Sequence, residues 1–362
     1  MSRALLIHAA KINDRFGPLG ASMSMNYMAV GLPALGAALE GAGHQVELLH
    51  LGVQHKTDPD WDVEAEVRRT TPDVVGFSLH WHPQSWDTIQ AVRAVRRGAP
   101  KAFIVLGGFT ASAMHEDILE TVPEVDGVIR GDGEKALVAL VAALEAGADL
   151  QSVPNLSHRR GDQIIANPIT EVSTAVEISG LDYERFDLLR NSERYIQDFC
   201  GPFFIPHRRP QAAMMAMGQR IFGGAKRNTM ILPAGRGCSV TCGWCGGGKL
   251  SHKKFHGRAD WFQLTPGRTA ALIARSVELG FGGVQACFDP TPKDPRHWIE
   301  VAEKVKASGV RTTMFFESYA IPHPDLVAAL VDAFDSVLIS MSPESPDETV
   351  RRRFRPLYFN ND

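Results

Sequence analysis

The first 150 residues alternate between short apolar runs and longer segments whose apolar positions recur with helical spacing. Short apolar runs bounded by glycine or proline are typical of strands buried on both faces, and the longer segments are typical of the helices that cover them. The predicted strands are residues 3–8, 44–49, 72–78, 102–108 and 125–129. The predicted helices are residues 31–43, 88–97 and 135–146. This alternation predicts an α/β domain with a doubly wound parallel sheet.

The alternation is lost over residues 151–227 and returns after them. The middle segment mixes Pro, Gly, Met and basic residues, which is typical of an irregular linker or cap. Further on, the predicted strands are residues 228–233, 283–289, 310–317 and 336–342. The predicted helices are residues 265–278, 296–308 and 324–334. This strand–helix repeat predicts part of a TIM-like (β/α) barrel, a fold that presents its functional groups at the carboxyl ends of the strands.

Composition and charge exclude several classes of function. The chain has 362 residues, of which 44% are hydrophobic and 22% are charged, as in ordinary globular proteins. Its formal net charge of −3 gives no general attraction to nucleic acids or anionic membranes. No apolar stretch approaches the roughly 20 residues of a membrane-spanning helix, and the apolar start is too short for a signal peptide. Five cysteines, three of them clustered, are more typical of a reducing cytoplasm than of a disulfide framework. We therefore expect a cytoplasmic protein with no nucleic-acid partner and no membrane span.

The cluster of cysteines carries the most specific chemistry in the chain. Cys238, Cys242 and Cys245 have the spacing C-x3-C-x2-C. Three thiolates on one loop can hold three corners of a cubane iron–sulfur cluster and leave the fourth iron open to a small ligand. A zinc site usually takes four ligands in paired spacing, and a disulfide would leave one thiol over. Zinc and purely structural readings remain the alternatives, and Cys200 and Cys287 are read as small buried residues.

This segment resembles the radical S-adenosylmethionine (SAM) enzymes. In that family a [4Fe–4S] cluster binds SAM through its open iron, and reduction of the cluster cleaves SAM to a 5′-deoxyadenosyl radical. By this resemblance the three cysteines are the cluster ligands, and a small redox protein such as flavodoxin or ferredoxin is the electron donor. The residues that the resemblance assigns to SAM are Trp244, Gly246, Asp289, Glu317, Ser340, Ser342 and Glu344. For the segment 340–345 the alternative is a strand-end turn followed by a helix cap.

Glycines lie near the end of the third predicted strand, at the end of the fourth and shortly after the fifth. At such positions a flat ligand could approach the backbone. Ahead of a radical SAM motif, the segments 74–82, 107–112 and 125–134 resemble the cobalamin-binding domain of B12-dependent radical SAM enzymes. The residues that this resemblance assigns to cobalamin are Ser78, Trp81, His82, Gly107, Gly108, Thr110, Ser112, Gly131, Gly133 and Glu134. The Asp-x-His-x-x-Gly motif of the mutases does not occur in the sequence. Its absence favours methyl transfer, with a lower cobalt face that lacks such a loop histidine.

Together these resemblances imply a Rossmann-like cobalamin-binding domain at residues 1–150, a linker or cap at 151–227 and a partial radical SAM barrel at 228–362. Only four strand–helix units follow residue 228, so we expect the barrel to be truncated. The implied activity is that of a class B methyltransferase that moves a methyl group from SAM through methylcobalamin to an unactivated carbon. A B12-dependent cyclase or rearrangement enzyme and a non-catalytic cobalamin or iron–sulfur sensor are the alternatives. We expect a small-molecule or natural-product substrate, but the sequence does not identify it, and natural-product, lipid and tetrapyrrole substrates all remain open.

Overall fold

The structure, a computed structural model, describes residues 1–10, 27–198, 228–291, 293–341, 343–355 and 359–361. The chain divides into two compact units. The first unit comprises Met1–Ser173, Leu181–Tyr195 and Phe255–Gly257, and the second comprises Thr174–Gly180, Ile196–Lys254 and Arg258–Asp362.

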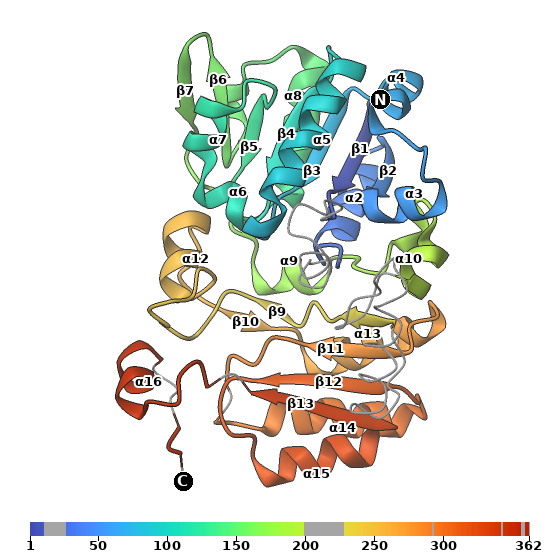
Figure 1. Ribbon diagram of the computed structural model, residues 1–362. Helices are drawn as coiled ribbons and strands as arrows, with labels where there is room; N and C mark the ends of the chain where they lie inside the picture. Colours follow the sequence, from blue (N-terminus) through green and yellow to red (C-terminus); the bar gives the residue numbers. More distant parts are fainter. Residues whose placement is uncertain (11–26, 199–227, 292, 342, 356–358, 362) are drawn as a thin grey trace. The chain divides into compact units, whose positions relative to one another are not determined.

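The first unit is built on a seven-stranded sheet with the order β2-β1-β3-β4-β5-β6-β7 (Figure 1). The first five strands are parallel, and β6 and β7 are antiparallel additions at one edge. The strands are β1 (Arg3–His8), β2 (Gln45–His50), β3 (Val74–Ser78), β4 (Phe103–Gly107), β5 (Gly127–Ile129), β6 (Leu156–Arg160) and β7 (Gln163–Ala166). The strand order reverses between β1 and β3, and ligands of such sheets bind beyond the carboxyl ends of the strands at this switch point.

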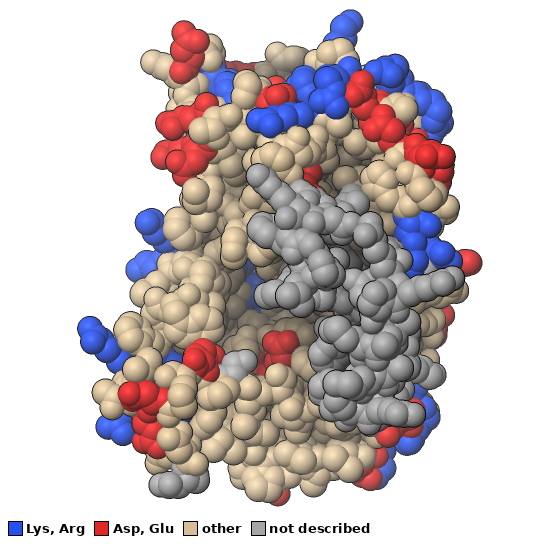
Figure 2. Space-filling model, in the orientation of Figure 1, with Lys and Arg blue, Asp and Glu red and all other residues tan. Residues whose placement is uncertain are grey.

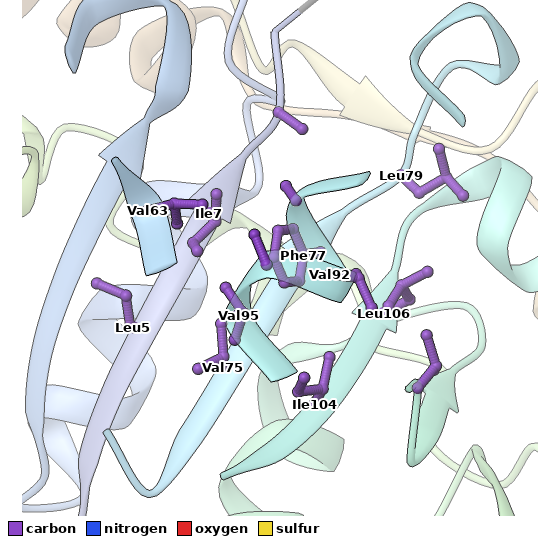
Figure 3. Close-up of a cluster of buried hydrophobic side chains, with 14 of the residues drawn as sticks. Leu5, Ile7, Val63, Val75, Phe77, Leu79, Val92, Val95, Ile104 and Leu106 are labelled. Atoms are coloured by element: carbon purple, nitrogen blue, oxygen red, sulfur yellow. The ribbon is translucent and has the colours of Figure 1, made fainter. Parts of the chain in front are cut away.

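Helices cover both faces of this sheet, which confirms the predicted doubly wound fold. The helices are α2 (Leu32–Gly41), α3 (Leu51–Thr57), α4 (Val63–Thr70), α5 (Ser85–Gly98), α6 (Phe109–Ala113), α7 (His115–Thr121), α8 (Glu134–Ala146) and α10 (Ser192–Asp198), with short 3-10 turns η1 (His82–Gln84), η2 (Leu150–Ser152) and η3 (Phe186–Leu188). Alternate residues of each strand point to one face, so Leu5, Phe77 and Ile104 share a core with Val63 of α4 and Val92 of α5 (Figure 3). The helices α2 and α8 pack together on the opposite face.

The second unit contains a four-stranded parallel sheet with the order β13-β12-β11-β8. Its elements are β8 (Thr229–Ile231), β11 (Gly283–Ala286), β12 (Thr313–Ser318), β13 (Ser336–Met341), the helices α9 (Ala175–Ser179), α12 (Lys249–His256), α13 (Pro266–Glu278), α14 (Arg296–Ser308), α15 (Pro324–Ala333) and α16 (Glu348–Phe354), and the antiparallel pair β9 (Gly235–Arg236) and β10 (Phe262–Gln263). Thr265 caps α13, with Pro266 at its first position, which is a typical helix start. The predicted strand–helix repeat of a partial barrel is confirmed.

One face of this sheet is covered by α13, α14 and α15, and the other carries the polar strand residues. Trp298 of α14 contacts Phe316 of β12 edge to face, with ring centroids 5.2 Å apart. Because side chains alternate along a strand, Phe315 and Glu317 point to the opposite face. The register pairs Glu317 with Ser340 of β13, so these two polar residues lie side by side on the face opposite α13, α14 and α15.

Candidate functional site

The cysteine loop of the second unit begins at a glycine that no other residue could replace without a shift. Gly237 has a φ of +83°, and a Cβ at this position would lie 2.5 Å from the carbonyl oxygen of Asp260. The chain therefore turns sharply just before Cys238. The backbone N–H of Val240 then points at the Cys238 sulfur at 3.4 Å, and the N–H of Lys249, the first residue of α12, donates to the Val240 carbonyl at 2.9 Å. These bonds close the loop between β9 and α12.

The three thiols of this loop are partly accessible and lie near one another. Cys238, Cys242 and Cys245 are free and half-buried. Burial raises the pKa of Cys238 and of Cys242, and in both cases the neighbouring thiols add to the rise. Among the described residues no group of His, Cys, Asp or Glu side chains is arranged to hold one metal ion. Three thiols on one loop are the ligand set of a cubane cluster, in which each binds a different iron.

Of the residues that the sequence assigned to SAM, Trp244 and Gly246 lie on this loop, and Asp289 lies after the neighbouring strand β11. Trp244 is 56% exposed, between two of the cysteines, and Gly246 has open space where a Cβ would be. Asp289 follows β11 and is only 3% exposed. Burial raises the pKa of Asp289 to about 7, against the effect of a hydrogen bond from the Thr291 backbone. The Ser239 hydroxyl donates to the Pro290 carbonyl at 2.6 Å, which fixes the cysteine loop to the segment that carries Asp289.

The other predicted SAM residues differ in how accessible their polar groups are. Glu317 accepts a hydrogen bond from the side-chain amide of Gln285 at 2.9 Å, and it lies beside Ser340. Glu344 forms an ion pair with Arg355, so its carboxylate is already engaged within the protein. Ser342 lies outside the described residues.

Sequence reasoning missed several residues that complete this polar group. Gln285 and Cys287 alternate with Asp289 along one side of β11 and its extension, a pattern that could have been read as one inward-facing row. Burial, together with the nearby Glu317 carboxylate, raises the pKa of Cys287 well above its ordinary value. Tyr319 donates from its hydroxyl to the Cys287 carbonyl at 2.8 Å, and burial likewise raises its pKa.

In the first unit, the predicted cobalamin residues gather at the carboxyl ends of β3, β4 and β5. Gly108 has a φ of +104°, and a Cβ there would lie 2.8 Å from the Leu79 carbonyl oxygen. At Gly107 a Cβ would meet only the Ile129 carbonyl oxygen, at 3.9 Å. Among the described residues there is therefore room for a Cβ at Gly107, whereas Gly108 allows the two strand ends to approach closely. A glycine-bordered edge of this kind suits a broad, flat ligand such as a corrin.

Several of the predicted cobalamin side chains are engaged in holding the loops together. The Ser112 hydroxyl donates to the Gly108 carbonyl at 2.9 Å and accepts from the Gly131 N–H at 3.1 Å, and the side chain is buried. Thr110 donates from its hydroxyl to the His80 carbonyl at 2.9 Å. We therefore assign Ser112 and Thr110 to positioning the loops.

The remaining predictions fall on the same edge with different exposure. Ser78 and Glu134 are buried, at the end of β3 and the start of α8. Gly133 precedes α8 as its cap residue. Trp81 is half-buried and His82 is exposed, at the start of η1.

A buried histidine beside Trp81 was not predicted. His8 ends β1 at the switch point, and its ring lies 6.4 Å from Trp81 and 4.9 Å from His50 between centroids. Burial lowers the pKa of His8 well below its ordinary value, and the nearby His50 and His80 lower it further. Its Nε2 lies 3.2 Å from the Gln84 side-chain nitrogen, and because an amide nitrogen only donates, Nε2 is the acceptor. The polar end of an otherwise apolar strand was the available signal.

Charged side chains outside these sites are largely paired. Figure 2 shows basic and acidic side chains interspersed at the top of the view, where α4 and α5 lie. Arg68 and Arg97 both bond to Glu64 at 2.7 Å, and Arg96 bonds to Asp126 at 2.5 Å. In the described part of the chain, no helix has the length and apolar character needed to cross a membrane.

Comparisons with known proteins find likenesses in sequence and in fold. The family model described as B12 binding domain matches residues 18–141. The anaerobic magnesium-protoporphyrin IX monomethyl ester cyclase of Synechocystis is 26% identical over 249 residues, which cover 66% of this chain and 43% of the cyclase. The hopanoid C-3 methylase of Methylococcus capsulatus is 28% identical over 134 residues, which cover 37% of this chain and 25% of the methylase.

A solved structure extends the likeness to both units. The radical SAM methyltransferase TsrM of Kitasatospora setae, with cobalamin and a [4Fe–4S] cluster bound, matches with a TM-score of 0.62 and 16% identity. The match covers 94% of this chain and 59% of TsrM. The chain thus spans less than two thirds of the length of each of these relatives, and at this identity the likeness to TsrM establishes the fold.

Proposed function

Since this chain belongs to the radical SAM proteins that carry a B12-binding domain, we propose that it forms part of a cobalamin-dependent radical SAM methyltransferase. The observation that carries the proposal is the presence of both sites in one chain. One is a three-thiol loop at a barrel-type sheet, and the other is a glycine-bordered edge of a B12-binding domain. The methylase and TsrM, a radical SAM methyltransferase, support methyl transfer as the reaction.

In this proposal the protein's own residues bind and orient three cofactors. Cys238, Cys242 and Cys245 hold a [4Fe–4S] cluster, and the cobalamin lies at the carboxyl edge of the sheet in residues 1–150. When bound, the cluster, SAM and cobalamin supply the radical and methyl-transfer chemistry. The adenine of SAM would stack on Trp244, because this exposed ring lies between two ligand cysteines.

The buried carboxyl of Asp289 is suited to the ammonium group of SAM. A pKa of about 7 means that the carboxyl is only partly ionised at neutral pH, and a bound cation would favour the ionised form. Glu317 and Ser340 offer an acceptor and a hydroxyl side by side, which suits the two hydroxyl groups of a ribose. The electron donor in this proposal is a flavodoxin- or ferredoxin-type protein, and the substrate is a small molecule or natural product.

The cyclase from Synechocystis favours a second candidate, a reaction with the same cofactors and no methyl transfer. Methyl-labelled SAM separates the two. Label in the product supports the methyltransferase, and a modified product without label supports a cyclase or rearrangement enzyme. If no 5′-deoxyadenosine forms with any reductant, the chain is a cobalamin- and cluster-binding sensor, and both catalytic proposals fail.

The first experiment is the iron and cobalt content of the chain after anaerobic reconstitution with iron, sulfide and hydroxocobalamin. We expect about four irons and one cobalt per chain. Cys242→Ala should lose iron and keep cobalt, whereas Cys287→Ala, a matched removal of a cysteine outside the loop, should keep both. Iron without cobalt in the unaltered chain would contradict the cobalamin half of the proposal, and iron retained by Cys242→Ala would contradict the cluster assignment.

A further inference from the structure

The carboxyl-terminal turn of α16 contacts the cysteine loop, although the two segments are more than 100 residues apart in the sequence. The N–H of Gly243, between the second and third cysteines, donates to the Phe354 carbonyl at 2.9 Å. A Cβ at Gly243 would lie 3.3 Å from the Phe354 ring, so the two backbones approach closely. The end of α16 therefore supports the part of the loop that contains Cys242 and Cys245.

Arg355, the next residue, is buried and connects three strand and helix ends. Arg355 is only 6% exposed. One guanidinium nitrogen pairs with the Glu344 carboxylate in the segment after β13. The other donates to the Tyr319 carbonyl after β12 at 2.7 Å. A buried arginine that bonds two separate segments fixes their positions more firmly than an exposed one.

The backbone conformation of Glu344 also indicates that the surrounding structure holds this residue in place. Glu344 has a φ of +59°, a left-handed conformation that residues other than glycine adopt at a cost. The following carbonyl, of Ser345, accepts a hydrogen bond from Arg351 of α16 at 2.7 Å. The segment after β13 is thus held against α16 at two successive residues.

The two charges of the pair act on the cluster loop with opposite sign. Arg355 directly follows Phe354, whose carbonyl accepts the N–H of Gly243 beside Cys242, so a buried positive charge is held next to the residue that contacts the cluster loop. The Glu344 carboxylate pairs with this guanidinium and partly offsets its charge. Reduction of an iron–sulfur cluster adds negative charge, and the local net charge and hydrogen bonds help to set its potential.

We propose that Glu344 and Arg355 form a positioning pair that supports the cluster loop and tunes the reduction potential of a cluster held there. Arg355 supplies a fixed positive charge that favours the reduced cluster, and Glu344 partly offsets it. This inference rests on the proposed function only in requiring the cluster. It reassigns Glu344 from a contact with SAM to a partner of Arg355, because its carboxylate is engaged within the protein.

The test is an EPR-monitored redox titration of the reconstituted full chain without SAM or substrate. We expect Arg355→Gln to shift the midpoint potential to more negative values and Glu344→Gln to shift it to more positive values. The double variant should return toward the unaltered chain. Arg352→Gln removes an equal charge from an exposed position of the same helix and should shift the potential less than Arg355→Gln.

Other outcomes would overturn the inference. Equal shifts in Arg355→Gln and Arg352→Gln, or shifts of the same sign in both single variants of the pair, would show that the pair has no specific electrostatic role. If Arg355→Gln takes up no iron, Arg355→Lys decides. Iron uptake with a nearly unaltered potential supports the inference, and loss of iron there too reduces the pair to a folding contact and overturns it. An unaltered chain that takes up no iron would instead contradict the proposed function itself.

Discussion

The two units offer ligands different kinds of surface at the carboxyl ends of their strands. In the first unit the edge is formed by glycine backbone, and side chains such as Ser112 and Thr110 bond to neighbouring loops. In the second unit the strand ends carry Glu317 and Asp289, and the cysteine loop adds thiols. In our proposal the first edge recognises its ligand by the space it leaves, and the second by charge and by donor atoms.

This difference predicts how each site responds to perturbation. A site defined by backbone and space should be sensitive to one added methyl group and indifferent to pH. A site defined by buried polar groups should respond to protonation, because burial shifts their pKa values. The predictions below test this contrast, from the largest expected effect to the smallest.

The largest effect is expected from the pH dependence of Asp289 in the second unit. Burial raises the pKa of this carboxyl from 3.8 to about 7, so between these pH values the folded chain binds a proton that the unfolded chain releases. The free energy of unfolding should therefore fall as the pH rises from about 4 to about 7 and stay level above, by at most about 4 kcal/mol. Asp289→Asn should remove this fall and be more stable than the unaltered chain at pH 8.

Denaturant unfolding of both proteins at pH 5 and pH 8 measures this effect. Asp294→Asn is the control, because the pKa of Asp294 is lowered to about 2 by Arg296 and the group is exposed. This control should not gain stability at pH 8. Parallel pH profiles for Asp289→Asn and the unaltered chain would show that the buried carboxyl has no such effect.

In the first unit, substitution of Gly108 should lower stability more than substitution of Gly107. Alanine there would hold an unfavourable left-handed backbone and place its Cβ 2.8 Å from the Leu79 carbonyl oxygen. Gly108→Ala should lower the free energy of unfolding by about 1–3 kcal/mol and weaken cobalamin binding, since the strand ends must separate. Thermal unfolding and cobalt content measure the two effects. Gly43→Ala is the matched control, because Gly43 has a φ of +89° and, among the described residues other than its chain neighbours, no atom would lie within 4 Å of its Cβ; an equal loss in both would contradict the role of close approach.

The same contrast explains what the sequence could predict. The strands β1, β3, β4 and β5 of the first unit are largely apolar and buried, so their pattern identified them, and β2 was identified by its apolar second half. The cysteine spacing likewise identified the loop, because the three thiols are close in sequence. By contrast, β6 and β7 are short and partly polar, and residues 151–166 therefore looked like linker although they extend the sheet.

Contacts between distant segments were beyond sequence reasoning. Nothing in the run 351–355 distinguishes Arg355, which pairs with Glu344, from Arg352, which is exposed. Ser112 was selected as a ligand contact because it follows a glycine pair, but its hydroxyl is engaged with Gly108 and Gly131. In both cases the residue type indicated a polar role, and only the packing showed which partner the group has.

The smallest effect on stability is expected at Gly107, which also gives the sharpest test of the glycine-bordered edge of the first unit. A Cβ here would meet only the Ile129 carbonyl oxygen at 3.9 Å, which is ordinary contact, so Gly107→Ala should fold as stably as the unaltered chain. If cobalamin lies against this backbone, the added methyl group should still weaken its binding, by roughly tenfold or about 1.4 kcal/mol. Titration with hydroxocobalamin, followed by absorbance, measures this affinity at pH 6 and pH 8. Unchanged affinity in a stable Gly107→Ala protein would mean that the corrin lies elsewhere on the edge, and an affinity that follows pH would mean that side chains, rather than space, define this site.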